Sequence, residues 1–213
     1  MKKFLLLISA LVLASLLPAV ADDQEGWVSL FNGENLEGWK SNEETPGVFS
    51  VEEGAIKVDG GRAHLFYAGD VNDGSFKNFE VKLKVKTTKG ANGGFYFHTE
   101  YQEKGWPSEG YECQINSTHS DDRKTGSLYG IQDVLKNSPS TDGEWFDYHI
   151  TVKDKNVRIA VNGKEVVNYT EPEDPERSGS FKGRVLDKGT FAIQGHDPKS
   201  VTYVKDIEVK VLD

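Results

Sequence analysis

The 213-residue chain carries 25 lysine and arginine residues against 34 aspartate and glutamate residues, which gives a formal net charge of −9 at pH 7. This negative balance argues against nucleic acids and anionic membranes as partners. The only cysteine is Cys113, which excludes a disulfide bond within the chain. We therefore expect the folded protein to be held together by its hydrophobic core.

The first 21 residues have the pattern of a secretory signal peptide. Lys2 and Lys3 precede an apolar run at residues 4–17, and Ala-Val-Ala at residues 19–21 matches the site that signal peptidase cleaves. The run is shorter than the ~20 residues that a membrane-spanning helix needs. We expect residues 1–21 to be removed and residues 22–213 to form one domain without a membrane anchor, in a periplasmic or secreted protein.

Hydrophobic residues in the rest of the chain recur with a period of two, the period of β-strands. The alternating segments, in chain order, are residues 28–31, 79–86, 146–152, 157–161, 165–169, 189–194 and 201–211. Asn162-Gly163 is a strong signal for a two-residue hairpin turn, and the polar residues 171–183 indicate a loop. Many short antiparallel strands in one domain predict an all-β fold, a two-sheet antiparallel sandwich or jelly roll.

Two further segments present polar side chains at alternate positions. In the first, phenylalanines alternate with Tyr96 and His98; in the second, an apolar face alternates with Glu112, Gln114 and Asn116. The loop between them is short enough for the two strands to be antiparallel neighbours, in which case these side chains form one polar patch. The alternative is an outer face that is merely solvated.

A third segment and a loop add candidate binding residues. Gln194 and His196 lie on one side of their strand, and Gly195 between them allows a close backbone approach. A histidine in this place is also common in turns, but amide, imidazole and carboxylate groups near strand ends are typical of a polyol site. In the loop between the two polar strands, Trp106 either stacks on a sugar ring or anchors the loop on Tyr101.

Seven short motifs, in order along residues 26–211, resemble those of the family called 3-keto-disaccharide hydrolases, formerly a domain of unknown function. They are G-W-V-S-L-F-N-G-E-N-L-E-G-W at residues 26–39, G-A-N-G-G-F-Y-F at 90–97, G-Y-E-C-Q at 110–114, T-G-S-L-Y at 125–129, G-E-W-F-D-Y at 143–148, V-N-G at 161–163 and A-I-Q-G-H-D at 192–197. The resemblance covers nearly the whole expected mature chain.

The resemblance implies a concanavalin-like jelly roll, with one convex and one concave sheet, and a carbohydrate substrate. It also implies a reaction in which a ketone at C3 of a sugar acidifies the hydrogen on C2, the aglycone leaves C1 by elimination, and water adds. Such an enzyme needs a base, a group that stabilises the enolate oxygen and a proton source. It does not need the paired carboxylates of retaining glycosidases, and the strand of Glu112 supplies one carboxylate and two amides.

We therefore expect an exported hydrolase that acts on 3-keto glycosides or disaccharides, with Glu112 and His196 as its acid and base. The alternative is a non-catalytic carbohydrate-binding module, in which the same side chains only hold a sugar. Binding modules usually accompany a catalytic domain, so a single expected domain favours the enzyme. The expected substrate-binding residues are Tyr96, His98, Trp106, Gln114, Asn116, Tyr129 and Gln194.

No cofactor is expected. His98, Glu112 and His196 come from three strands and would form a two-histidine, one-carboxylate set for a divalent metal if they converged. Nothing in their spacing requires this, and we favour a role for them as hydrogen-bonding groups for sugar hydroxyls.

Overall fold

Antiparallel strands are the main regular secondary structure of the computed structural model, which describes residues 25–42 and 44–213. The expected signal peptide at residues 1–21 lies outside the described residues. The strands are β1 (Trp27–Ser29), β2 (Trp39–Ser41), β3 (Phe49–Glu52), β4 (Ala55–Asp59), β5 (Ala63–Tyr67), β6 (Phe79–Thr87), β7 (Gly93–Thr99), β8 (Tyr111–Ile115), β9 (Phe146–Lys153), β10 (Asn156–Val161), β11 (Lys164–Thr170), β12 (Thr190–Gly195) and β13 (Val201–Val211). Two short 3-10 helices, η1 (Val71–Gly74) and η2 (Gly179–Phe181), lie in loops.

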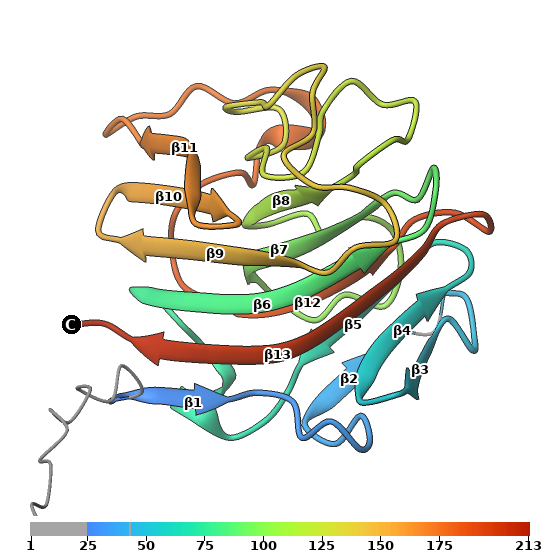
Figure 1. Cartoon of the computed structure of the whole chain (residues 1–213). Helices are drawn as coiled ribbons and strands as arrows, with labels where there is room; N and C mark the ends of the chain where they lie inside the picture. The colour runs from blue at the N-terminus through green and yellow to red at the C-terminus, as the bar shows by residue number, and fades with distance from the viewer. Residues whose placement is uncertain (1–24, 43) are drawn as a thin grey trace, which may run out of the picture.

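The strands form two sheets that pack face to face. The larger sheet has the order β11-β10-β9-β6-β13-β4-β3, with β1 also paired to β13, and the smaller has the order β2-β5-β12-β7-β8. Figure 1 shows the long strands β6 and β13 of the larger sheet crossing in front of β12 and β7 of the smaller one. This arrangement confirms the all-β, two-sheet antiparallel fold that the alternating sequence predicted.

An aromatic cluster fills the space between the two sheets. Phe191 of β12 stacks on Phe76 and Phe95, with ring centroids 4.5 and 5.4 Å apart, and meets Phe79 edge-on at 5.0 Å. All four side chains are fully buried. Because buried aromatic rings contribute much of the energy of a core, this cluster holds the smaller sheet at a defined position against the larger one.

Two turns are defined by asparagine residues, and the first of them forms as the sequence predicted. Asn162 and Gly163 have φ angles of 50° and 73°, the left-handed pair that a type I′ hairpin turn requires, and they join β10 to β11. Near the N-terminal end, Asn32 accepts hydrogen bonds from two following backbone N–H groups within its turn. Trp39 is buried beyond that turn, and its indole N–H donates to the backbone oxygen of Leu30 at 2.8 Å.

Long loops gather at one end of the sandwich. The loop after β8 and the segment between β11 and β12 lie together at the top of Figure 1, and the rings of Tyr129 and Phe181 from these two segments are 6.4 Å apart. Residues 171–183 form the expected loop, interrupted only by η2. The helical segments in the described part of the chain are too short to cross a membrane.

Candidate functional site

A cavity of about 540 Å³ lies on the outer face of the smaller sheet, on the side away from the aromatic cluster. This volume is within the range of roughly 300–1,000 Å³ that is typical of small-molecule sites. All of the predicted site residues except His98 and Asn116 line it, namely Tyr96, Trp106, Glu112, Gln114, Tyr129, Gln194 and His196. The fold therefore brings together residues that are up to one hundred positions apart in the chain.

Strand alternation in β8 separates the core from the cavity. Cys113 and Ile115 belong to the core between the sheets, whereas Glu112 and Gln114 line the cavity on the opposite face. Strands β7 and β8 are antiparallel neighbours, with Tyr96 directly opposite Glu112. The two strands thus share one polar patch, as the alternation predicted.

Glu112 is the buried carboxylate of this patch. It accepts hydrogen bonds from the hydroxyl of Tyr96 at 2.8 Å and from the side-chain amide of Gln194 at 2.9 Å, and a guanidinium nitrogen of Arg184 lies 3.4 Å from it. Burial raises the pKa of the Glu112 carboxyl, although the charge of Arg184 and the two hydrogen bonds oppose this rise. A buried carboxyl with a raised pKa in a cavity is typical of a group that exchanges protons.

The absence of a side chain at Gly94 provides the space that the side chain of Glu112 occupies. A Cβ atom at Gly94 would lie 2.8 Å from Oε1 and 3.1 Å from Cγ of Glu112. At the neighbouring Gly93, the nearest atom to such a Cβ would be the backbone oxygen of Gln194 at 3.4 Å, which is an ordinary contact. The second glycine of the Gly-Gly pair is therefore the one that the site requires.

His196 directly follows β12 and is oriented by Asp197, whose Oδ2 lies 3.0 Å from Nδ1 of the ring. Burial alone would raise the pKa of Asp197, but hydrogen bonds from Ser200 and His196 lower it to about 2. The carboxylate is therefore ionised and can only accept, so Nδ1 carries the proton. This leaves Nε2 of the neutral imidazole able to take up a proton.

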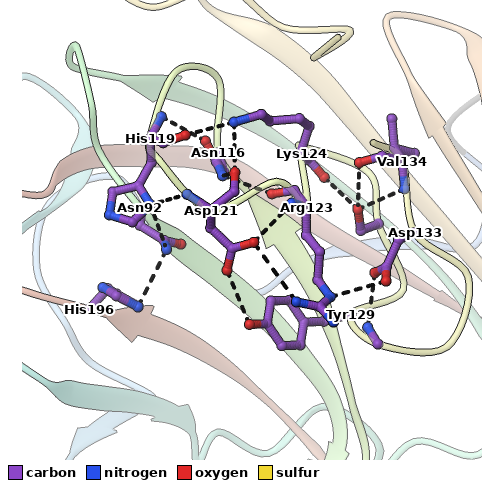
Figure 2. A network of polar contacts seen from close by, with 12 residues as sticks. Asn92, Asn116, His119, Asp121, Arg123, Lys124, Tyr129, Asp133, Val134 and His196 are labelled. Atoms are coloured by element: carbon purple, nitrogen blue, oxygen red, sulfur yellow. Dashed lines mark hydrogen bonds and ion pairs between the residues drawn. The ribbon is translucent and has the colours of Figure 1, made fainter. Parts of the chain in front are cut away.

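Asn92 orients the same imidazole from the other side. Figure 2 shows its amide between His196 and His119, with Nδ2 at 3.3 Å from Nε2 of His196 and 3.3 Å from Nδ1 of His119. Nδ1 of His119 also accepts a hydrogen bond from the backbone N–H of Asp121 at 3.1 Å. Asn92 lines the cavity but was not predicted as a site residue, although it lies within one of the sequence motifs.

Trp106 forms part of the cavity wall and packs on the candidate base. Its ring centroid is 5.3 Å from that of His196, and the guanidinium of Arg62 lies 5.2 Å from the indole on another side. Glu44 pairs with Arg62 and also accepts a hydrogen bond from the backbone of the Trp106 loop. The ring of Tyr101, the other anchor considered, packs against a phenylalanine of β5 instead. The indole therefore contacts both the cavity and His196.

Several buried polar atoms at the cavity have no hydrogen-bond partner among the described residues. They are the amide oxygens of Asn92, Gln114 and Gln194. Both ring nitrogens of His64, whose ring centroid lies 5.6 Å from that of Tyr96, also have no partner among the described residues. Burial lowers the pKa of His64 to about 3, so its ring stays neutral. Buried polar atoms without partners are rare in folded proteins, and amide oxygens of this kind suit the hydroxyl donors of a polyol.

Tyr129 lines the cavity, whereas Asn116 does not. The hydroxyl of Tyr129 donates to Asp121 at 3.1 Å. The side chain of Asn116 donates to the backbone oxygens of Asp121 and Arg123 and accepts from the backbone N–H of His119. Asn116, which we expected among the substrate-binding residues, therefore lies outside the cavity lining, and its side chain holds the loop that follows β8 (Figure 2).

His98 is also turned away from the cavity. Its φ angle is 55°, and the pairing register between β7 and β12 shifts at this point. Nε2 donates to the backbone oxygen of Lys77 at 2.9 Å, and Nδ1 accepts from the backbone N–H of Asp187 at 3.2 Å. The expectation that His98 shares a face with Tyr96 is wrong, because the left-handed backbone conformation interrupts the alternation.

The three residues considered as a metal-binding set therefore do not converge. Both ring nitrogens of His98 are occupied by backbone groups outside the cavity, whereas Glu112 and His196 line it. Within residues 25–42 and 44–213, no three histidine, cysteine, aspartate or glutamate side chains are arranged to hold a metal ion.

Arg184 is the charged cavity residue that sequence reasoning missed. It lies in the segment between β11 and β12, one residue beyond the loop that the sequence indicated at residues 171–183, and its side chain is 7% exposed. Nη1 donates to the backbone oxygen of Gly110 at 3.2 Å, and the guanidinium carbon is 5.2 Å from the ring centroid of Tyr96. A single arginine in a loop has no periodic signal, so only the tertiary fold brings it to Glu112.

Comparison with known proteins gives consistent matches. A family model described as "3-keto-alpha-glucoside-1,2-lyase-like domain" matches residues 26–210. A 3-keto-disaccharide hydrolase of Bacteroides thetaiotaomicron is 27% identical over 172 residues, which cover 69% of this chain and 59% of that protein. The chain thus spans less than two thirds of this relative's length.

Two solved structures of candidate glycosyl hydrolases from Parabacteroides distasonis ATCC 8503 are also similar. The first has a TM-score of 0.74 at 25% identity and covers 89% of this chain and 95% of its own. The second has a TM-score of 0.67 at 22% identity, and the match covers 87% of this chain and 99% of that structure. At this identity the similarity shows a shared fold alone.

The space left by Gly94 is testable by paired substitutions. We expect Gly94→Ala to lower the free energy of unfolding by about 1–3 kcal/mol, because the new methyl group overlaps the Glu112 side chain. Gly93→Ala, its matched control, should be neutral or stabilising by up to about 1 kcal/mol, since alanine restricts the unfolded chain. Urea denaturation of both variants measures the difference, and equal effects would show that the two glycines do not differ in this way.

The outward orientation of His98 predicts a structural effect of its loss. Asparagine adopts the left-handed backbone conformation readily, but His98→Asn removes the ring that bonds the backbone groups of Lys77 and Asp187. We therefore expect the free energy of unfolding to fall by about 1–3 kcal/mol. His149→Asn is the control. This half-exposed histidine pairs with Glu80 and meets the ring of Trp27 edge-on at 5.9 Å, and surface ion pairs contribute little. If the two variants melt at the same temperature, the ring of His98 is not a structural element.

Proposed function

The chain belongs to the 3-keto-alpha-glucoside-1,2-lyase-like family, and we propose that it is an enzyme that cleaves the glycosidic bond of 3-keto glycosides or disaccharides by elimination and hydration. The observation that carries the proposal is that Glu112 and His196, from β8 and the end of β12, line one cavity, with the imidazole oriented by Asp197. A carboxyl group and an imidazole in one cavity support the proposal, because the reaction needs an acid and a base.

The ketone at C3 makes the first step accessible. A base removes the proton from C2, the electron pair of that bond forms the C2–C3 double bond, and the carbonyl π electrons move to the C3 oxygen as an enolate. When the carbonyl re-forms, a C1–C2 double bond appears and the aglycone leaves C1 with the electrons of its bond. Addition of water across C1 and C2 completes a net hydrolysis without a redox change.

In this scheme His196 is the base and Glu112 is the acid. Nδ1 of His196 already donates to the ionised Asp197, so Nε2 accepts the C2 proton in place of the hydrogen bond from the Asn92 amide. The raised pKa of Glu112 favours a protonated carboxyl, which is the form that supplies a proton to the departing oxygen. Glu112 is the only carboxylate among the described residues that line the cavity, which does not match the carboxylate pair of a retaining glycosidase.

Substrate binding is assigned to the amides and aromatic rings of the same cavity. The unpartnered oxygens of Gln114, Gln194 and Asn92 accept hydrogen bonds from sugar hydroxyls, and Trp106 and Tyr129 provide aromatic surface for a sugar ring. These groups alone would also suit a non-catalytic carbohydrate-binding module. The buried Glu112 and the Asp197–His196 pair favour an enzyme, because a module that only binds has no need of either.

The proposed activity is tested with a 3-keto glucoside and its unoxidised parent. We expect release of the aglycone from the 3-keto compound alone, and Glu112→Gln should reduce turnover at least ~10²-fold with little change in melting temperature, because the amide cannot donate a carboxyl proton. Glu80→Gln, on the outer face of the larger sheet, is the matched control and should retain full turnover.

The same experiment separates the alternatives. Retention of the sugar without release would identify a binding module, and equal release from both compounds would identify an ordinary glycosidase. Near-normal turnover by Glu112→Gln would remove Glu112 from the mechanism while leaving the substrate class intact.

We also propose that the chain is exported, with cleavage after Ala21, to a periplasmic or extracellular location. The basis is the charged, apolar and small-residue pattern at residues 1–21. Expression of the full sequence in a bacterial host, followed by mass measurement of the soluble product, should give a chain that begins at Asp22. A product that retains residues 1–21 in the cytoplasm would contradict this proposal.

A further inference from the structure

Arg184 is the only lysine or arginine among the described residues that line the cavity. Its side chain is 7% exposed, and it lies against Glu112 and the ring of Tyr96. A guanidinium group keeps its positive charge at all physiological pH values. The cavity therefore holds a permanent cation in a setting from which most water is excluded.

The guanidinium of Arg184 has N–H donors that the described contacts do not use and that a ligand could bind. Its hydrogen bonds to the backbone oxygen of Gly110 and to Glu112 use two of the five N–H donors that an arginine carries. The distance to Glu112 is 3.4 Å, which is longer than the roughly 2.7–2.9 Å of a strong charge-assisted hydrogen bond. Arg184 is thus near Glu112 without being fully engaged by it.

A hydrogen bond from Arg177 fixes the backbone of Arg184. Nε of Arg177 donates to the backbone oxygen of Arg184 at 2.9 Å, and the same guanidinium donates to the hydroxyl of Tyr169 at 2.6 Å. Nearby, Glu171 accepts a hydrogen bond from the backbone N–H of Leu186 at 3.0 Å. A cation positioned before the reaction begins stabilises developing charge without reorganising.

On the basis of the proposed function, we propose that Arg184 is a further catalytic residue that binds the C3 oxygen of the substrate and stabilises the enolate. As the C2 proton moves to Nε2 of His196, one negative charge develops on the C3 oxygen, and an N–H of Arg184 donates a hydrogen bond to it. Arg184 itself transfers no proton. The charge is retained until the carbonyl re-forms and the aglycone leaves with the C1–O electron pair.

This role is compatible with the raised pKa of Glu112. The raised pKa makes the protonated form of Glu112 more accessible. That form places no second negative charge beside the enolate, which leaves the guanidinium available to the C3 oxygen. The competing role for Arg184 is to lower the pKa of Glu112 and nothing more. The two roles predict different pH profiles for an Arg184 variant. If Arg184 only lowers the pKa of Glu112, its loss displaces one limb of the profile. If Arg184 binds the enolate, its loss lowers the rate at every pH.

The test measures enolate formation separately from cleavage. Exchange of the C2 hydrogen of 3-keto-glucose in D2O, followed by NMR, reports proton removal, and aglycone release from a 3-keto glucoside reports the whole reaction. Arg184→Ala should slow both about 10²–10³-fold across the pH range, and guanidinium ions in the buffer should restore part of the rate. Arg184→Lys keeps the charge but loses the planar fork, and it should be at least ~10-fold slower than wild type. This variant provides the test if the alanine variant does not fold.

Arg158→Ala is the matched control, since Arg158 pairs with Glu165 on the other sheet, and it should exchange and cleave at the wild-type rate. The role of Arg184 is overturned if a folded Arg184 variant exchanges within about threefold of wild type, or if its loss only displaces one limb of the pH profile. A wild-type protein that neither exchanges nor cleaves these compounds would overturn the proposed function, and the role of Arg184 with it.

Discussion

The burial of one carboxyl group, that of Glu112, is the constraint on which the rest of the site depends. A buried carboxyl group is unfavourable unless hydrogen bonds compensate for its burial, and its ionised form needs an opposite charge as well. Tyr96, Gln194 and Arg184 supply these interactions from three different parts of the chain, and Gly94 supplies the space. The positions of the neighbouring polar groups are therefore linked, and a change in any of them alters the environment of the carboxyl.

The two faces of β8 jointly hold the segment that delivers Arg184. Tyr111 points to the opposite side from Glu112, and its hydroxyl donates to the buried Glu171, while Glu112 meets Arg184 on the cavity side. Arg177 links the hydroxyl of Tyr111 to the backbone of Arg184. Adjacent residues of β8 point to opposite faces, so Tyr111 and Glu112 contact two different parts of the segment between β11 and β12. These contacts explain how Arg184, a loop residue, attains a defined position in the cavity.

Trp106 connects the wall of the cavity to the ring of His196. The indole packs on the ring of His196 and is itself held by the Arg62–Glu44 pair at the entrance. Under the proposed function, a sugar stacked on this indole would contact the side chain that packs on the candidate base.

The sequence by itself determined the features that depend on local backbone periodicity. The alternation of β8 placed Glu112 and Gln114 on one face, and Asn162-Gly163 specified a hairpin, because both signals arise from residues adjacent in the chain. It did not reveal Arg184, since a loop residue reaches Glu112 only through contacts made far away in sequence. It also misplaced His98, because a positive φ angle and a register shift at that point depend on how β7 pairs with β12, and pairing between distant strands is decided by tertiary packing.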